Sequence, residues 1–180
     1  MKEHDKITSQ LSLPYLETYD ELIEDIFKTL EQKFALKKDS DKRFIDLGSG
    51  DGRIVIYCGF NFGIKSLGIE INENLIKEAN ENLKTLINKH NLKKKQLKHI
   101  IIEFGDLFRQ DLQEFDFIYT YSLPTMHKYM NHVFITAKKD AIIISHKYPL
   151  KGFDTYLKLD FELSHKTENT DLSTFFYRKI

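Results

Sequence analysis

The chain has 180 residues, of which 41% are hydrophobic and 30% are charged, a composition typical of one globular domain. Lys plus Arg equals Asp plus Glu at 27 each, so no overall positive field favours binding to nucleic acid or to an anionic membrane. The single cysteine, Cys58, excludes a disulfide framework and a cysteine-based zinc site, and we expect it to be a buried thiol. No apolar run is long enough to span a membrane. The composition therefore predicts a soluble cytoplasmic protein without a metal site or a membrane span.

The first residues differ in character from the rest of the chain. Residues 1–13 mix Lys with acidic residues and lack an apolar core, so they are neither a signal peptide nor a transit peptide. We expect a flexible N-terminus there, followed by one domain over residues 14–180. Pro14 precedes an expected amphipathic helix that begins near Thr18, because Thr18 and Glu21 have the spacing of a capping box and apolar residues then recur at helical spacing.

Residues 44–53, FIDLGSGDGR, form the most informative segment of the chain. An apolar run typical of a buried strand leads into Gly48, Gly50 and Gly52, and residues 54–63 then have a helical pattern. Glycine permits positive φ angles and lets the backbone approach a ligand closely, while the start of the helix offers free N–H groups. The segment therefore predicts a ligand-binding turn between a strand and a helix.

The spacing of the glycines indicates the kind of ligand. The pattern is G-x-G-x-G, whereas dinucleotide-binding turns have G-x-G-x-x-G. Asp46 lies two residues before the first glycine, where its carboxylate would repel a pyrophosphate and attract a cationic amino group. The turn therefore favours a ligand with an amino acid end and no phosphates.

The rest of the chain alternates strand-like and helical patterns. Strands are expected at residues 66–69, 99–104, 116–121 and 141–145, and helices at residues 74–89 and 124–137. Two further strand-like runs, 156–163 and 173–178, predict a closing antiparallel hairpin. Strands separated by helices imply right-handed crossovers. We therefore predict a doubly wound α/β fold with a mostly parallel seven-stranded sheet and its ligand at the carboxyl ends of the strands.

Polar side chains follow several of these strands. Glu70 follows the second strand, 22 residues after Gly48, where an acid suits ribose hydroxyls. Asp106 follows the third strand and residues 121–124 follow the fourth. Taken singly, Glu70 and Asp106 could be surface acids, and Asp106 could cap a helical turn. The predicted fold brings all of them around one crevice.

The segment FIDLGSGDGR resembles the first motif of the class I methyltransferases, which use S-adenosylmethionine. The resemblance implies a Rossmann-like fold, Glu70 on the ribose hydroxyls, Asp106 on the adenine amino group, and catalytic residues at the end of the fourth strand. The implied cofactor-binding residues are Tyr15, Thr18, Asp46, Gly48, Ser49, Gly50, Gly52, Glu70, Ile71, Asp106, Leu107 and Tyr121. The implied catalytic residues are Tyr121, Ser122 and Pro124.

Three further motifs narrow the resemblance. They are LPYLET at residues 13–18, GDGRIV at residues 50–55 and SLPTM at residues 122–126. They look like the small protein-lysine methyltransferases, which include archaeal broad-specificity enzymes and mitochondrial enzymes that modify the ATP synthase c subunit. Leu16 and Glu17 depart from the entry motif, which often has a second proline and a threonine. The resemblance implies methyl transfer to lysine side chains of a protein substrate, with nucleic acid not expected as a partner.

A lysine nucleophile must lose a proton before it can attack a methyl group, although its ordinary pKa is about 10.4. An apolar channel beside a cationic sulfonium lowers the pKa of the amine. We expect only one of Tyr119 and Tyr121 to face this channel, and we favour Tyr121 because it ends the strand; Tyr119 is expected to pack at the surface. Tyr15, Tyr19 and the carbonyl of Ser122 are expected to complete the channel.

Other polar residues have two interpretations each. His146 is either a proton acceptor or a polar strand end, while His127 and His132 are expected at the surface. The lysine-rich residues 93–98 are expected to form a solvated loop, because no aromatic residues interleave with the lysines. Their amines are also candidates for self-methylation.

Three alternatives to a protein-lysine methyltransferase stay open. A methyltransferase for nucleobase amines usually has Asn or Asp, two prolines and an aromatic residue after the fourth strand, and residues 122–125 are Ser-Leu-Pro-Thr instead. A non-catalytic partner protein could keep the cofactor pocket without transferring a methyl group. A small-molecule methyltransferase would need a lid, for which the chain has little length left.

Overall fold

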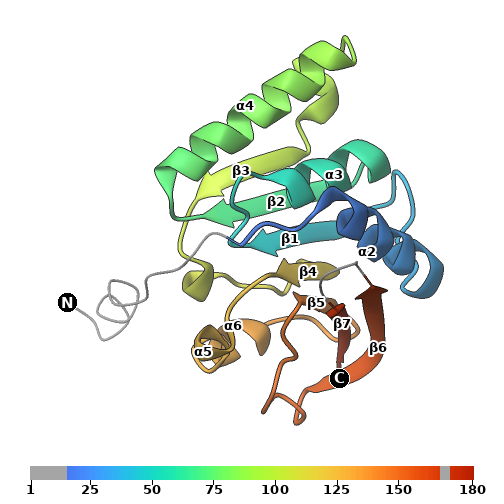
Figure 1. Cartoon of the computed structure of the whole chain (residues 1–180), viewed down its shortest axis with the longest axis vertical. Helices are drawn as coiled ribbons and strands as arrows, with labels where there is room; N and C mark the ends of the chain where they lie inside the picture. Colours follow the sequence, from blue (N-terminus) through green and yellow to red (C-terminus); the bar gives the residue numbers. More distant parts are fainter. Residues whose placement is uncertain (1–15, 167–170) are drawn as a thin grey trace.

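The computed structural model describes residues 16–166 and 171–180. The expected flexible residues 1–13, Tyr15 and most of the turn of the expected hairpin lie outside the described residues. Seven strands form one sheet in the order β3-β2-β1-β4-β5-β7-β6 (Figure 1). Their bounds are Arg43–Leu47 for β1, Lys65–Glu70 for β2, Ile100–Phe104 for β3, Phe117–Thr120 for β4, Ile142–His146 for β5, Leu157–Lys166 for β6 and Asp171–Lys179 for β7.

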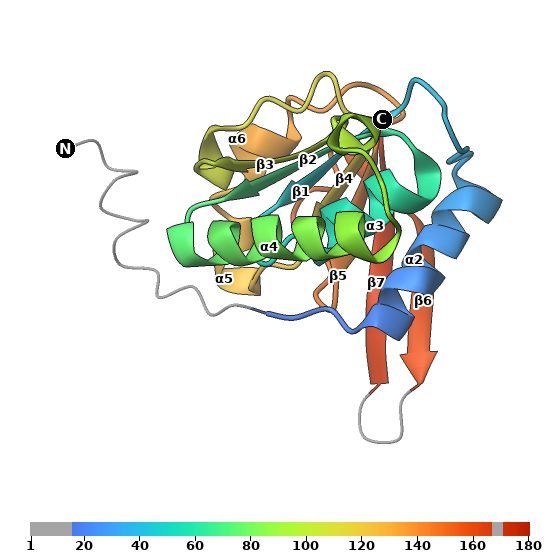
Figure 2. The same ribbon diagram turned by 90° about the horizontal axis from the view of Figure 1, so that it is seen from above.

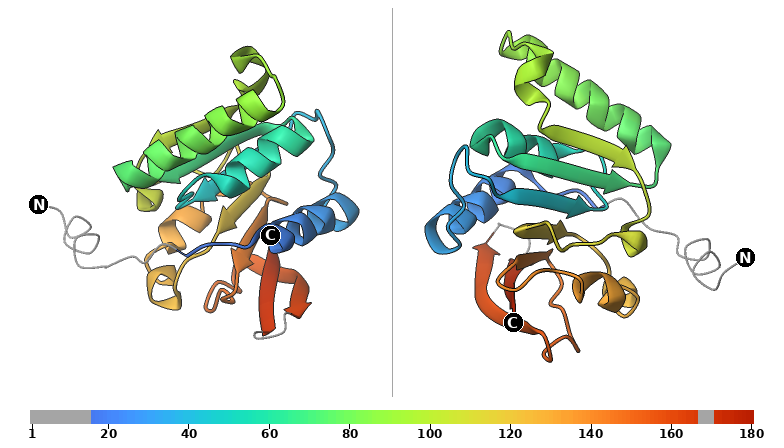
Figure 3. Two further views of the ribbon diagram at one scale, coloured as in Figure 1. Left: turned by 45° about the horizontal axis from the view of Figure 1, so that its top comes forward. Right: turned by 180° about the vertical axis from the view of Figure 1, so that it is seen from behind.

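The first five strands are parallel, and β7 lies antiparallel to both β5 and β6. Parallel pairing puts the carboxyl ends of β1, β2, β3 and β4 at the same edge, which is where the sequence places its polar residues. The predicted α/β fold, with a mostly parallel seven-stranded sheet and a closing hairpin, is confirmed. Figure 3 shows α4 beside one edge of the sheet and the β6–β7 hairpin at the other.

Helices cover both faces of the sheet. Their bounds are Asp20–Lys33 for α2, Arg53–Phe62 for α3, Glu73–Lys89 for α4, Pro124–His127 for α5 and Asn131–Phe134 for α6, with short 3₁₀ turns at Lys94–Leu97 (η1) and Leu107–Arg109 (η2). The view from above shows α2, α3 and α4 on one side of the sheet and α6 on the other (Figure 2). This two-sided cover buries both faces of the central strands.

Side chains that alternate along the central strands fill two cores. Phe44 of β1 and Phe117 of β4 pack under α2 and α3 with Phe27, and Cys58 of α3 is buried there as expected. Ile45 and Ile118 point to the other face, toward the core that α5, α6 and the segment after β5 cover. The alternation is what a strand period of two residues predicts for a sheet buried on both sides.

The helix ahead of β1 begins later than the capping box predicts. Tyr19 is the N-cap of α2 without a side-chain hydrogen bond, so the predicted Thr18–Glu21 box is wrong. Thr18 is buried, and its hydroxyl lies 2.9 Å from the hydroxyl of Tyr119 on β4. A buried tyrosine hydroxyl needs a partner, and that requirement outweighs the local cap.

The expected long helix over residues 124–137 is also wrong. The segment forms two single turns, α5 and α6, joined by hydrogen bonds of 3₁₀ type such as Met130 N–H to His127 O at 2.9 Å. Met126, Met130 and Val133 are all buried in one core. Their helical spacing therefore indicated the buried face correctly, although most of the other residues there are weak helix formers and the turns do not join.

We predict that Gly52→Ala lowers the free energy of unfolding by about 2 kcal/mol or more. Gly52 has a left-handed φ of 77°, and a Cβ there would lie 2.9 Å from both Ala79 Cβ and Ile102 Cδ1. Gly152 is a matched control, because its φ is 83° and a Cβ would meet nothing within 4 Å. Gly152→Ala should cost only the backbone strain, about 1 kcal/mol. Urea denaturation measures both, and equal losses would contradict the packing argument.

Candidate functional site

The turn between β1 and α3, which we call the glycine turn, comprises residues 48–52. Gly48, Gly50 and Gly52 have φ angles of 88°, 54° and 77°, all in the left-handed region that glycine tolerates best. The N–H groups of Gly48 and Ser49 donate to Ile69 O of β2 at 2.9 and 3.0 Å. The glycines are therefore needed for the path of the backbone, as the sequence predicts.

The glycine turn also lies directly over β2, which the sequence analysis did not foresee. A Cβ at Gly68 in β2 would lie 2.6 Å from Ser49 Oγ and 2.8 Å from Ser49 Cβ. Gly68 therefore makes room for Ser49. The available signal was a lone glycine inside an apolar strand, which often marks a close backbone approach.

Asp46, at the carboxyl end of β1, is 2% exposed, and its Oδ1 has no hydrogen-bond partner. Burial, followed by the negative charges of Glu70 and Asp51, raises the pKa of Asp46 well above its ordinary value. Ser49 Oγ is likewise buried without a partner. The arrangement attracts a cationic hydrogen-bond donor and opposes a phosphate, in agreement with the ligand expected from the glycine spacing.

Glu70 holds the glycine turn against the end of β2. Its Oε2 accepts from Gly50 N–H at 2.8 Å, and its Oε1 accepts from the N–H groups of Ile71 and Asn72, each at 2.8 Å. A carboxylate has about four acceptor positions, so about one is left for a ligand hydroxyl. Glu70 is thus a structural part of the turn as well as a candidate ribose contact, a role that stays a prediction.

Arg53, the first residue of α3, links the glycine turn to residues 16–19, which we call the entry segment. Its Nε and Nη2 donate to the carboxylate of Asp51, with Nη2 at 2.7 Å from Oδ2. Its Nη1 donates to Thr18 O at 3.2 Å and forms an ion pair with Glu17. Sequence analysis did not select Arg53 as a site residue, although it follows the last glycine of a quoted motif.

Tyr119 of β4 and Tyr121, directly after its end, both face the glycine turn. Tyr119 is 2% exposed and Tyr121 is half-buried, and the two lie in the wall of one small pocket. The other residues around this pocket are Leu16, Thr18, Asp46, Gly48, Ser49, Asp51, Arg53 and Ile54. The expected surface position of Tyr119 is wrong, because residues two apart on a strand point to the same face. Several of the residues predicted to bind the cofactor therefore lie around this pocket.

Tyr121 contacts a series of hydrogen-bonded polar side chains that leads away from the pocket. Its ring meets the His146 ring edge-on at 4.8 Å. His146 Nδ1 lies 2.7 Å from Thr174 Oγ1, and His165 Nε2 lies 3.1 Å from the same oxygen. His165 Nδ1 is 3.7 Å from a carboxylate oxygen of Asp25 on α2. These side chains support the ring of Tyr121 on the side away from the pocket.

Burial sets the protonation states in this region. Burial, then the positive charges of His165 and Lys147, lower the pKa of His146 to about 4, so it is neutral at neutral pH. Burial raises the pKa of Tyr121, although Lys147 opposes that rise, so the hydroxyl keeps its proton. A neutral histidine and a protonated tyrosine therefore stand beside the pocket.

Ser122 and Pro124 lie past the end of β4, and neither lines the small pocket at the glycine turn. Ser122 Oγ lies 3.1 Å from Thr120 Oγ1 and donates to Met130 Sδ. The Ser122 carbonyl, expected to line the channel, lies 3.1 Å from His127 Nε2. His127 is only 4% exposed, so its expected surface position is wrong, and burial lowers its pKa. His132 is exposed as expected.

Asp106 and Leu107 lie at the end of β3. Asp106 Oδ1 accepts from Phe108 N–H at 2.8 Å, so the capping interpretation of this acid is confirmed. Leu107 Cδ2 would lie 3.7 Å from a Cβ at Gly48, which places this side chain against the glycine turn. Ile71, after β2, is 48% exposed. Their contacts with a cofactor stay predictions.

The strand order, the left-handed glycine turn after β1 and the acids at the carboxyl ends of β1 and β2 define a Rossmann-like methyltransferase fold. An RNA methyltransferase from Salinibacter ruber, solved with S-adenosyl-L-homocysteine, has this fold with a TM-score of 0.70 and 22% identity, over 92% of this chain and 94% of that one. Residues 46–156 match the ANTKMT methyltransferase domain. The chain belongs to that family of methyltransferases.

Two curated relatives are similar in sequence. A protein-lysine N-methyltransferase of Saccharolobus islandicus (strain REY15A) is 24% identical over 144 residues, which cover 79% of this chain and 81% of the relative. A lysine N-methyltransferase for the ATP synthase c subunit, from Caenorhabditis elegans, is 31% identical over 67 residues, which cover 37% of this chain and 35% of that relative. Both have the name of the enzyme class that the sequence motifs resemble.

Two other features are absent from the described residues. No group of three or more His, Cys, Asp and Glu side chains in the described part of the chain could hold a metal ion. None of the helices in the same residues has the length and apolar character needed to cross a membrane.

The buried state of His146 predicts a loss of stability in acid. Its pKa of about 4 in the folded protein lies below its ordinary value of 6.5, so its contribution is intact above about 6.5 and is lost as the pH falls toward 4. For His146 alone the loss between about pH 7 and about pH 5 is on the order of 2 kcal/mol.

His146→Gln should remove this part of the pH dependence, as urea denaturation at both pH values would measure. The exposed His90, the C-cap that follows α4, provides the control variant His90→Gln. The control should lose stability in acid as the unmodified protein does. An unchanged loss in the His146 variant would contradict the assignment.

Proposed function

We propose that the protein transfers the methyl group of S-adenosylmethionine to lysine side chains of a protein substrate. Family membership supports methyl transfer, and the names of the two curated relatives support a lysine acceptor. The observation that carries the choice of cofactor is the buried, unpartnered Oδ1 of Asp46 beside the unpartnered Oγ of Ser49. These two atoms suit the charged amino acid end of S-adenosylmethionine.

The residues around the glycine turn fit the other parts of this cofactor. Glu70 has about one acceptor position left for a ribose hydroxyl, and its backbone partners hold it at the end of β2. Asp106 and the apolar side chains of Ile71 and Leu107 follow β2 and β3, where the adenine would lie. Thr18 belongs to the entry segment, and Tyr15, which lies outside the described residues, directly precedes that segment in the sequence. Phosphate-bearing cofactors fit poorly, because three acids gather near the turn.

The cofactor supplies a methyl group on a positively charged sulfur, which a lysine amine attacks in line. The main task of the protein is then to align the amine and to exclude water. Tyr121 is suited to this task because its ring is half-buried and His146 supports it edge-on. Tyr119 adds a buried aromatic wall. Such a wall favours the neutral amine over the ammonium, because desolvation lowers the pKa of a lysine.

Ser122 and Pro124 contribute by shaping the backbone beside Tyr121. The contact between His127 Nε2 and Ser122 O fixes the peptide after β4, and Pro124 begins α5 directly afterwards. A proline at the first helical position is compatible with the missing N–H group. We therefore expect the position of Tyr121 to depend on the segment that directly follows it.

The function is tested with labelled S-adenosylmethionine and cell lysate, treated with protease or with nuclease before separation. We expect label in protein that mass spectrometry assigns to lysine. Label that survives protease and disappears with nuclease would instead indicate a nucleic-acid methyltransferase. Cofactor binding without transfer to any macromolecule would contradict the proposal and favour a non-catalytic partner protein or a small-molecule substrate.

We predict that Asp46→Asn stabilises the protein without cofactor and weakens cofactor binding. The amide has the size of the carboxyl group and removes a buried negative charge that two neighbouring acids oppose. Thermal unfolding should show a gain on the order of 1 kcal/mol. Calorimetric titration with S-adenosylmethionine should show about tenfold weaker binding or more, because a charged contact is lost.

Asp41→Asn is the matched control, since Asp41 is exposed in the loop before β1. This variant should change neither quantity. Unchanged cofactor affinity in the Asp46 variant would refute the assignment of Asp46, whatever the effect on stability.

A further inference from the structure

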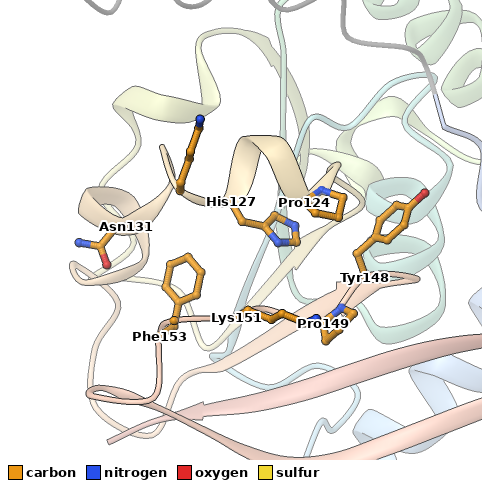
Figure 4. Close-up of a pocket in the computed structure, with 9 residues that line it drawn as sticks. Pro124, His127, Asn131, Tyr148, Pro149, Lys151 and Phe153 are labelled. Carbon is orange, nitrogen blue, oxygen red and sulfur yellow. The ribbon is translucent and has the colours of Figure 1, made fainter.

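A second pocket lies past the end of β4, on the side of the sheet that has α5 and α6, and its volume is about 600 Å³. Figure 4 shows Pro124 and His127 across the hollow from Lys151 and Phe153, with Tyr148 at one end. The first two come from α5 and the others from the segment that follows β5. The glycine turn contributes nothing to this pocket, so it is separate from the candidate cofactor site.

The charge of this pocket is positive. Lys128 and Lys151 contribute to its lining, and no Asp or Glu does so. Within residues 16–166 and 171–180, neither lysine has a carboxylate within ion-pairing distance, whereas Lys138, at the other end of β4, pairs with Asp116 at 2.9 Å. No carboxylate of these described residues therefore neutralises the two ammonium groups, although Lys128 Nζ lies 4.7 Å from the centre of the Tyr129 ring.

Polar and apolar groups also line the pocket. Asn131 Oδ1 accepts from the hydroxyl of Tyr156 at 2.8 Å, which leaves the amide nitrogen as a donor. Pro124 and Pro149 contribute apolar surface to the same lining. Cations and a donor around an apolar wall match a carboxylate at the end of a short aliphatic side chain.

The pocket begins beside the position where the target amine is expected. The ring of Tyr148 in its lining lies 6.5 Å, centre to centre, from the ring of Tyr121, which lines the pocket at the glycine turn. An extended peptide rises about 3.3 Å per residue, so a residue about two positions from the target lysine spans that distance.

We propose that this pocket binds an acidic side chain of the protein substrate within about two residues of the target lysine. The inference rests on the proposed function and adds a preference of the enzyme for acidic sequence around its target. A nucleic acid fits the pocket less well, because the backbone of a strand needs a row of cations. Phe153, at 3% exposed, also offers no face on which a base could stack.

The test uses two series of short peptides, each with one central lysine. One series has Glu one or two residues from that lysine, on either side, and the other series has Gln at the same positions. With the unmodified protein, kcat/KM for methyl transfer should be about tenfold higher for the best Glu peptide than for its Gln partner. Fluorescence anisotropy of the same labelled peptides, with S-adenosylhomocysteine present, measures binding without transfer and should show the same order.

Lys128→Gln combined with Lys151→Gln should abolish the preference by lowering kcat/KM for Glu peptides, with Gln peptides and cofactor affinity unchanged. The control, Lys77→Gln combined with Lys89→Gln, removes two exposed charges from α4 at the far edge of the sheet and should keep the preference. Lys128→Glu combined with Lys151→Glu should shift the preference toward peptides with a basic residue at the same positions.

Equal kcat/KM for Glu and Gln peptides with the unmodified protein would overturn the proposal. The proposal would also be overturned if the double variant lowered kcat/KM for the Glu and Gln peptides equally. It would likewise be overturned if methyl transfer to nucleic acid were lost in the double variant. Failure of the proposed function is distinguishable, because no peptide would then be methylated. In that case a binding preference for Glu peptides that the double variant lacks would still support an acid-binding pocket, and its absence would reject it.

Discussion

The close approach of the glycine turn to β2 is the constraint on which the rest of the site depends. Gly68 has no side chain, and Ser49 takes the space that one would fill. Glu70 then accepts from Gly50 N–H, so the end of β2 and the turn after β1 form one unit. That unit fixes the start of α3 and the direction of the Asp46 carboxylate. A ligand would therefore meet a preformed surface, which reduces the entropy lost on binding.

The electrostatics of this unit oppose stability and favour a ligand. Burial raises the pKa of Asp46, and the negative charges of Glu70 and Asp51 raise it further. Groups of this kind are concentrated at functional sites, where the free energy lost in folding is recovered on binding. The two large cores on either side of the sheet provide the stability that tolerates such a site.

The sequence predicted the sheet and the glycine turn well, because both depend on local patterns: apolar runs of strand length and glycines where φ is positive. The prediction failed where a contact between residues far apart in the sequence determines the local structure. The Thr18 hydroxyl contacts Tyr119, 101 positions away, in place of a capping bond, and no local pattern indicates that contact. The two short turns α5 and α6 had the apolar spacing of one helix, so the buried face was predicted and the backbone was not. The position of Tyr119 could have been predicted from strand geometry alone, because residues two apart on a strand point to the same face.

Arg53 gives the entry segment a thermodynamic link to the pocket. One guanidinium group contacts Asp51 in the glycine turn and Thr18 and Glu17 in the segment that leads into α2. Leu16 and Thr18 also form part of the pocket wall. Order in the entry segment and occupancy of the pocket are therefore reciprocal: whatever free energy an ordered segment adds to ligand binding, a bound ligand returns as resistance of that segment to local opening. The N-terminal part of the domain is thereby a component of the binding equilibrium as well as a cover for the sheet.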